Sequence, residues 1–278
     1  MSYLSPDEVQ ILGNLLKTFF SLPYSTDLDG KDAETLIRIV KGSTGPRSKR
    51  KELFDIIDGI SGYSVKTLSK SPRATRVDLQ EQRFCDVEEV RKMRSENADN
   101  AAAQGHILLT YMHDRIHEQM TERNITTAKS LILLKDWNEA RTEFNFVYWE
   151  EDFIGFVNNL KQRNEAGEID WVMQDAGLHA RDKNRLVHKY GRMNESPEPI
   201  RLLRMHYKHN QIFTDHDIPL DANKISFNVN QLSWDKLIEM IAAHETSVVA
   251  LQTQLAAELL QNKDNVSVTK MIDALPKS

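Results

Sequence analysis

The sequence predicts a mixed α/β protein, with a central mixed β-sheet flanked by helices and a long helix at the C-terminal end. Two observations predict this class. Apolar residues recur at helical spacing near both ends of the chain, whereas the middle contains apolar or alternating runs typical of strands. The two kinds of segment also alternate along the chain, as expected of this class. With 278 residues, 40% of them hydrophobic, the chain is long enough to bury a large core.

The N-terminal region predicts helices. Ser5-Pro6 followed by two acidic residues is a helix-start signal, and apolar residues at helical spacing follow as far as Phe19. A second helix is predicted over 32–41, because a glycine- and proline-containing stretch follows it. Residues 49–57 are predicted to form another short helix.

The middle of the chain predicts both kinds of element. Two glycines punctuate residues 58–68, which predict two short strands joined by a tight turn. Helices are expected over 78–104, a very polar stretch, and over 106–123. Strands are expected over 129–135 and 142–149, and a helix over 153–163.

The C-terminal part is predicted to be a mixture followed by one helix. Residues 164–230 read as loops, a basic helix and short strands. Ser233 is the expected N-cap of a long amphipathic helix that extends to about Asn262. A working division separates residues 1–160 from residues 161–278.

Composition limits the cellular setting. The single cysteine, Cys85, excludes a disulfide within the chain, which favours a reducing compartment. The N-terminus lacks the pattern of a signal peptide, and no apolar run has the length of a membrane span. A cytoplasmic location is therefore expected.

Basic residues are concentrated locally, although the net charge is −5. Arg38 to Arg76 contains ten Lys or Arg against three Asp or Glu, and Arg181 to Lys208 contains eight against three. A phosphate-binding surface needs only such a local patch. An ordinary solvated face is the alternative interpretation of either stretch.

The predicted hairpin carries the residues that indicate chemistry. Ser64 and Lys66 are two apart on the returning strand, so their side chains share a face while Val65 points into the core. A tight turn is expected to bring Asp58 beside them. Phosphodiester hydrolysis needs a carboxylate for a divalent metal ion, a second oxygen ligand and a cation near the attacking water.

This arrangement resembles the PD-(D/E)xK nuclease superfamily, and type II restriction endonucleases in particular, over roughly residues 30–85. Ser64 stands where the superfamily has its second carboxylate, and Ile57 stands where a proline commonly precedes the aspartate. The Ser-x-Lys form resembles restriction enzymes that cut around CCGG and take the missing carboxylate from a glutamate on the following helix. The gap from Asp58 to Lys66 is shorter here than in that group.

The resemblance implies further site residues. Glu81, at the start of a predicted helix, is the first choice for the relocated carboxylate, and Asp78 is the alternative. Many nucleases of the superfamily also have a glutamate on the helix before the aspartate strand. Glu34 fits that role, whereas Glu52 is nearer in sequence but is expected to face solvent.

Taken together, these residues predict a Mg²⁺-dependent restriction endonuclease that acts on double-stranded DNA as a homodimer and is paired with a modification enzyme. Residues 1–160 would hold the catalytic core, and residues 161–278 would serve recognition and dimerisation. Non-catalytic DNA binding or assembly is the rival function. The residues expected to contact DNA are Arg181, Lys183, Arg185, Arg192, Arg201, Arg204 and Lys208.

Overall fold

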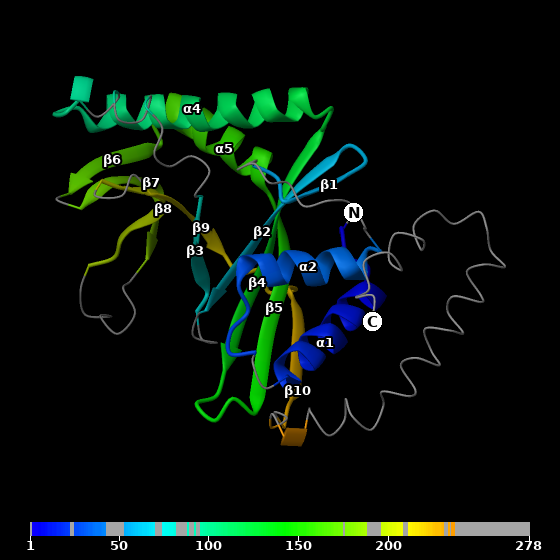
Figure 1. Cartoon of the computed structure of the whole chain (residues 1–278). Helices are drawn as coiled ribbons and strands as arrows, with labels where there is room; N and C mark the ends of the chain where they lie inside the picture. The colour runs from blue at the N-terminus through cyan, green and yellow to red at the C-terminus, as the bar shows by residue number, and fades with distance from the viewer. Residues whose placement is uncertain are drawn as a thin grey trace.

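The computed structural model confirms the mixed α and β class, but its strands form two five-stranded sheets rather than one central sheet (Figure 1). In the described part of the chain, no helix is long and apolar enough to cross a membrane. The structure describes residues 2–22, 25–42, 53–69, 74–81, 88, 92, 95–174, 176–187, 196–207, 211–230, 233 and 235–236.

Sheet A has the strand order β1-β2-β4-β5-β10. Its strands are β1 (Ile56–Asp58), β2 (Ser61–Ser69), β4 (Thr127–Trp137), β5 (Glu143–Asp152) and β10 (Asn223–Asn228). β2 runs parallel to β4, and the other neighbours are antiparallel. β1 pairs only with Ser61 to Tyr63, so β2 lies at the sheet edge from Ser64 onwards. This uncovered edge borders the candidate site.

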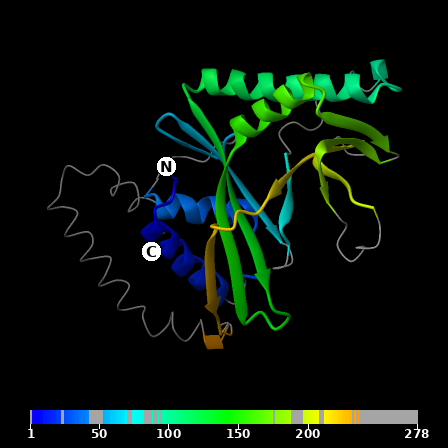
Figure 2. The same cartoon turned by 180° about the vertical axis from the view of Figure 1, so that it is seen from behind.

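Helices α1 (Pro6–Ser21) and α2 (Gly30–Val40) pack against sheet A, as Figure 2 shows from behind. Each begins with a capping box, formed by Ser5 with Glu8 and by Asp29 with Asp32. The apolar stripe of α1 is buried, and burying one leucine side chain of that stripe contributes about 1.5–3 kcal/mol. The caps and the buried stripe together fix where each helix begins and which face it turns inward.

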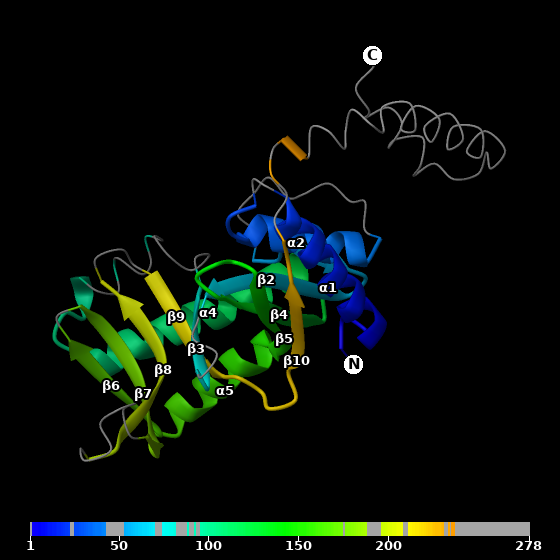
Figure 3. The same cartoon turned by 90° about the horizontal axis from the view of Figure 1, so that it is seen from below.

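Sheet B has the strand order β3-β9-β8-β7-β6. Its strands are β3 (Arg76–Gln80), β6 (Ile169–Gln174), β7 (Gly177–Val187), β8 (Glu198–His206) and β9 (Gln211–Asp217). Helices α4 (Ala101–Glu122) and α5 (Phe153–Glu165) lie on one side of it in Figure 1, and Figure 3 looks at the opposite side. Buried residues of sheet B, including Leu178, Leu203 and Met205, belong to the same core cluster as α4 and α5.

Several predicted elements are confirmed and others are wrong. The predicted helices over 106–123 and 153–163 correspond to α4 and α5, and the predicted strands over 129–135 and 142–149 to β4 and β5. Residues 78–104 are not one helix, because β3 occupies 76–80 and pairs with β9. Residues 56–57, the end of the predicted helix over 49–57, are strand, whereas Asp58 and the hairpin that follows it are strand as predicted. The polar composition of 78–104 gave no sign of this pairing, which depends on a segment over 130 residues further along.

Two C-terminal predictions have different outcomes. Lys236 donates its backbone N–H to Ser233 Oγ at 3.1 Å, as expected for an N-cap, but the rest of the predicted helix lies outside the described residues. The working division near residue 160 does not separate the sheets. β3, from the first part, belongs to sheet B, and β10, from the second part, belongs to sheet A.

Gly177 provides a test of sheet B. A Cβ atom there would lie 2.1 Å from the carbonyl oxygen of Met205 on β8, which cannot move without disturbing the ladder. We expect Gly177→Ala to lower the free energy of unfolding by about 1–3 kcal/mol in urea titrations. Gly30→Ala is the matched control, because a Cβ there meets nothing within 4 Å. Equal stabilities of the two variants would contradict the packing described.

Candidate functional site

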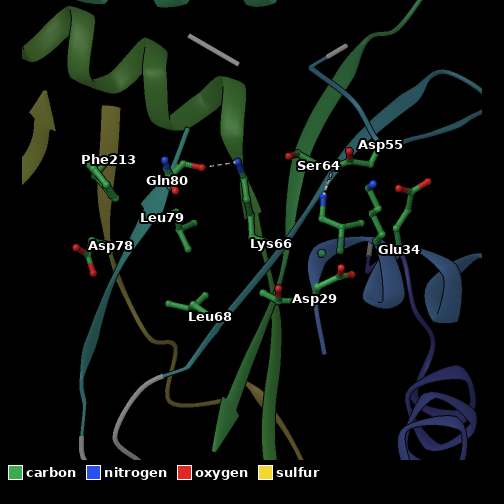
Figure 4. Close-up of a pocket in the computed structure, with 14 residues that line it drawn as sticks. Asp29, Glu34, Asp55, Ser64, Lys66, Leu68, Asp78, Leu79, Gln80 and Phe213 are labelled. Carbon is green, nitrogen blue, oxygen red and sulfur yellow. Dashed lines mark hydrogen bonds between the residues drawn. The ribbon is translucent and has the colours of Figure 1, made fainter. Parts of the chain in front are cut away.

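A cavity of about 560 Å³ lies along the uncovered edge of β2, between α2 and β3. Figure 4 shows Asp29, Glu34 and Asp55 on one side of it and the residues of β3 and β9 on the other. Its lining is rich in charged and polar side chains. It consists of Asp29, Gly30, Lys31, Glu34, Asp55, Ser64, Val65, Lys66, Thr67, Leu68, Asp78, Leu79, Gln80 and Phe213.

Ser64 and Lys66 both line this cavity, as their spacing predicted. Ser64 is buried, and Val65 between them belongs to the core cluster under α1 and α2. Val65 and Thr67 also line the cavity, so the cavity extends around the edge of β2 and meets side chains from both faces of the strand.

The Lys66 ammonium is held by two acceptors at the end of β3. Its Nζ donates to Glu81 Oε2 at 2.8 Å and to the Gln80 carbonyl oxygen at 3.0 Å. The side chains of Lys66 and Glu81 are only 14% and 4% exposed, so this is a buried ion pair. Removal of one partner from such a pair leaves an uncompensated charge and is strongly destabilising. The pair thus ties β2 of sheet A to β3 of sheet B.

Glu81 contacts Lys66, but both of its carboxylate oxygens are engaged in the protein interior. Oε1 accepts a hydrogen bond from Thr214 Oγ1 at 3.1 Å, and Thr214 in turn contacts His216 Nε2 at 2.9 Å. Glu81 follows a strand instead of opening a helix, and it is absent from the cavity lining. In this structure, Glu81 therefore holds the Lys66 ammonium and does not line the cavity.

Burial of His216 lowers the pKa of its imidazole to about 4, so the ring is neutral near pH 7. Thr214 donates its only hydroxyl hydrogen to Glu81, so its oxygen accepts from His216, which assigns the ring proton to Nε2. A chain of hydrogen bonds therefore runs from His216 through Thr214 and Glu81 to Lys66.

The hairpin does not bring Asp58 beside Ser64 and Lys66, as the sequence led us to expect. In the hairpin register, Asp58 pairs with Ser61, and Asp58 does not line the cavity. At about 3.3 Å per residue, Ser61 lies about 10 Å along the strand from Ser64. The side chain that the hairpin brings to the cavity is Asp55, three residues earlier, whose Oδ2 accepts from the Val65 backbone N–H at 2.7 Å.

Glu34 lies in the cavity wall, on α2, as the resemblance implied. Arg38, one helical turn later, donates from Nε to Glu34 Oε1 at 2.8 Å and from Nη2 to the Asp55 carbonyl oxygen at 2.5 Å. One guanidinium therefore joins α2 to the segment that carries Asp55. The glutamate considered as an alternative, Glu52, lies outside the described residues.

Sequence reasoning missed Asp55, Thr214 and His216. Asp55 had a signal, because it directly precedes the apolar pair Ile56-Ile57, which has the character of a short strand. Thr214 and His216 had none, since they approach Glu81 only through the pairing of β3 with β9.

The residues predicted to bind DNA do not form a single group. Arg201 and Arg204 are ion-paired with Asp215 and Asp78, and Arg185 is ion-paired with Asp217. Lys183 donates to the Gly167 carbonyl oxygen, and Arg181 lies opposite Arg201 across β7 and β8. Arg192 and Lys208 lie outside the described residues.

No group of three or more His, Cys, Asp or Glu side chains is arranged to hold a metal ion within the described ranges. Asp55 and Glu34, whose carboxylates are hard oxygen donors, both line the cavity. Mg²⁺ commonly takes only one or two protein carboxylates and completes its coordination with water and phosphate. The donor set therefore fits that ion.

Comparisons with protein-family models, with curated proteins and with solved structures each gave no significant match. Any functional conclusion therefore depends on the geometry and chemistry of the site itself.

The buried ion pair can be tested by mutation. We expect Lys66→Met to lower the free energy of unfolding by about 3–5 kcal/mol, because the Glu81 carboxylate loses its cation. The double variant Lys66→Met/Glu81→Gln should lose less than the sum of the two single variants, since no unpaired charge is left. Urea unfolding of all four proteins measures the coupling. Strict additivity would contradict a direct Lys66–Glu81 interaction.

The lowered pKa of His216 predicts that the stability of the protein depends on pH. Its folded-state pKa of about 4 lies below the ordinary value of 6.5, so the unfolded state binds the extra proton first. Stability should be intact above pH 6.5 and should fall, by up to about 3 kcal/mol, as pH decreases to 4. His216→Gln should remove this component of the curve. If the free energy of unfolding of the wild type and of His216→Gln changes in the same way between pH 7 and pH 4, the proposed contribution of His216 is refuted.

Proposed function

We propose that this protein is a Mg²⁺-dependent type II restriction endonuclease that hydrolyses phosphodiester bonds in double-stranded DNA at a specific sequence. The grouping of Glu34, Asp55, Ser64 and Lys66 around one cavity carries the proposal. The lining of this cavity offers carboxylate oxygens, a hydroxyl and an ammonium, which are the kinds of group that phosphodiester hydrolysis requires.

Asp55 and Glu34 are the residues that would hold Mg²⁺. They belong to two elements that Arg38 joins, so their side chains enter the cavity from a connected wall. When bound, the ion offsets charge on the phosphate and lowers the pKa of a coordinated water molecule. Glu81, the first choice from sequence, instead supports Lys66 in this proposal, because its two oxygens already accept from Lys66 and Thr214.

Lys66 is the proposed catalytic cation. Its ammonium orients the attacking water and stabilises the negative charge that grows on the phosphate oxygens as the water oxygen bonds to phosphorus and the leaving oxygen departs. Glu81 and the Gln80 carbonyl hold the ammonium in place, which reduces the reorganisation needed in the reaction. The Ser64 hydroxyl is a further hydrogen-bonding group for water or phosphate in the same cavity.

The proposed substrate also suggests an assembly. A palindromic recognition site is matched by a twofold homodimer, in which each subunit presents one cavity to one strand. The rival function, DNA binding without cleavage, does not require the carboxylates of Glu34 and Asp55 to line the same cavity as Lys66.

Asp55 and Asp58 give a matched pair of variants from one hairpin. We expect Asp55→Asn to lower the rate of plasmid cleavage in Mg²⁺ by about a hundredfold or more, because several kcal/mol of charge stabilisation would be lost. Asp58→Asn should cleave at the wild-type rate, since that carboxylate lies outside the cavity. Gel electrophoresis of plasmid DNA, with thermal unfolding of each variant, measures this.

Two results would overturn the proposal. One is a wild-type protein that binds DNA but leaves it uncut with Mg²⁺ or Mn²⁺. The other is an active Asp55→Asn variant beside an inactive but folded Asp58→Asn variant.

A further inference from the structure

The side of sheet B that faces away from α4 and α5 carries a cluster of arginines, which we call the arginine face. Residues directly opposite each other in neighbouring strands point to the same side of a sheet. The register pairs Arg204 with His179 and with Phe213, and it pairs Arg181 with Arg201. The arginine face consists of His179, Arg181, Arg201, Arg204, Phe213, Asp78 and Asp215.

Carboxylates orient two of these arginines. Arg201 donates from Nε and Nη2 to the two oxygens of Asp215, at 2.6 and 2.9 Å. Arg204 donates from Nη2 to Asp78 at 3.3 Å, and its guanidinium lies 4.4 Å from the centroid of the Phe213 ring. A bidentate pair and a stacked ring fix the plane of a guanidinium, so the remaining donors point in set directions.

The arginine face is continuous with the candidate active site. Asp78 and Phe213, which hold Arg204, also line the cavity that contains Lys66 (Figure 4). A duplex whose phosphate entered the cavity would therefore lie against this side of sheet B.

The charges within the arginine face are crowded and partly balanced. Burial lowers the pKa of His179, and the positive charges of Arg201, Arg181 and Arg204 lower it further. The carboxylates of Asp78 and Asp215 lie among the same side chains. Acidic groups at this position repel the full negative charge of phosphate oxygens more strongly than the partial charges on the edge of a base.

We propose that the arginine face reads guanine in the recognition sequence, with Arg181, Arg201 and Arg204 donating to the acceptors on the major-groove edge. This inference rests on the proposed function, because it assumes that double-stranded DNA occupies the cavity. Guanine presents two neighbouring acceptors there, O6 and N7, which match the planar fork of an arginine. The three residues are therefore specificity residues and not general phosphate contacts.

Substitution by lysine distinguishes base reading from phosphate binding. Arg181→Lys, Arg201→Lys and Arg204→Lys keep the positive charge but lose the fork. Each protein is incubated with a pool of duplexes that have a randomised central segment, with Ca²⁺ in place of Mg²⁺, and the retained duplexes are sequenced. Arg115→Lys is the control, because Arg115 is on α4, on the other side of sheet B.

We expect the wild type and Arg115→Lys to retain one shared sequence that contains guanine. At least one of the other variants should lose the preference for guanine at one position by about tenfold, with unchanged binding to unselected DNA. Thermal unfolding checks that each variant is folded. The inference is overturned if all variants retain the wild-type sequence, or if the wild type selects no sequence.

Cleavage of plasmid DNA by the wild type is measured separately and distinguishes the two proposals. If the wild type cleaves DNA and the lysine variants select the wild-type sequence, the proposed nuclease activity is supported and the proposed reading of guanine by the arginine face is contradicted. If the lysine variants select a different sequence but the wild type does not cleave DNA, the proposed reading of guanine is supported and the proposed nuclease activity is contradicted.

Discussion

The buried ion pair between Lys66 and Glu81 is the interaction on which the candidate site depends, because it joins the two sheets at the cavity. Lys66 comes from β2 of sheet A, whereas Glu81 directly follows β3 of sheet B. A small core cluster containing Val77 and Leu79 of β3 and Ile132 of β4 packs between the same sheets. Apolar burial supplies the non-directional part of this contact, and the ion pair fixes where the Lys66 ammonium lies.

The same junction connects the proposed chemistry to the proposed recognition. On β9, Thr214 turns inward to Glu81, whereas its neighbours Phe213 and Asp215 belong to the arginine face. One strand thus contacts Glu81, which holds Lys66, on one side and contributes to the arginine face on the other, since side chains alternate along a strand.

Local patterns predicted much of the fold and part of the site. Ser64 and Lys66 lie on one face of β2, as the local alternation of strand side chains predicts, and Glu34 lines the same cavity from a helix whose start Asp29 caps. The choice of Asp58 failed because a shift of register along a hairpin changes which side chain reaches a given point, and the sequence does not fix that register. Residues 76–80 were predicted mostly as helix, because the polar stretch that continues to residue 104 outweighed the short alternation of Val77 and Leu79 with polar residues.

The sequence by itself determined the alternation of helices and strands, the N-cap of α1, and the polar pair Ser64 and Lys66 on one side of β2. These depend on residues near one another in the chain, whose spacing is visible without a structure. Only the tertiary structure decided that the described strands form two sheets, that Asp55 and not Asp58 lines the cavity, and that Glu81 contacts both Lys66 and Thr214. Those relations join residues far apart in the chain, so packing and strand pairing establish them.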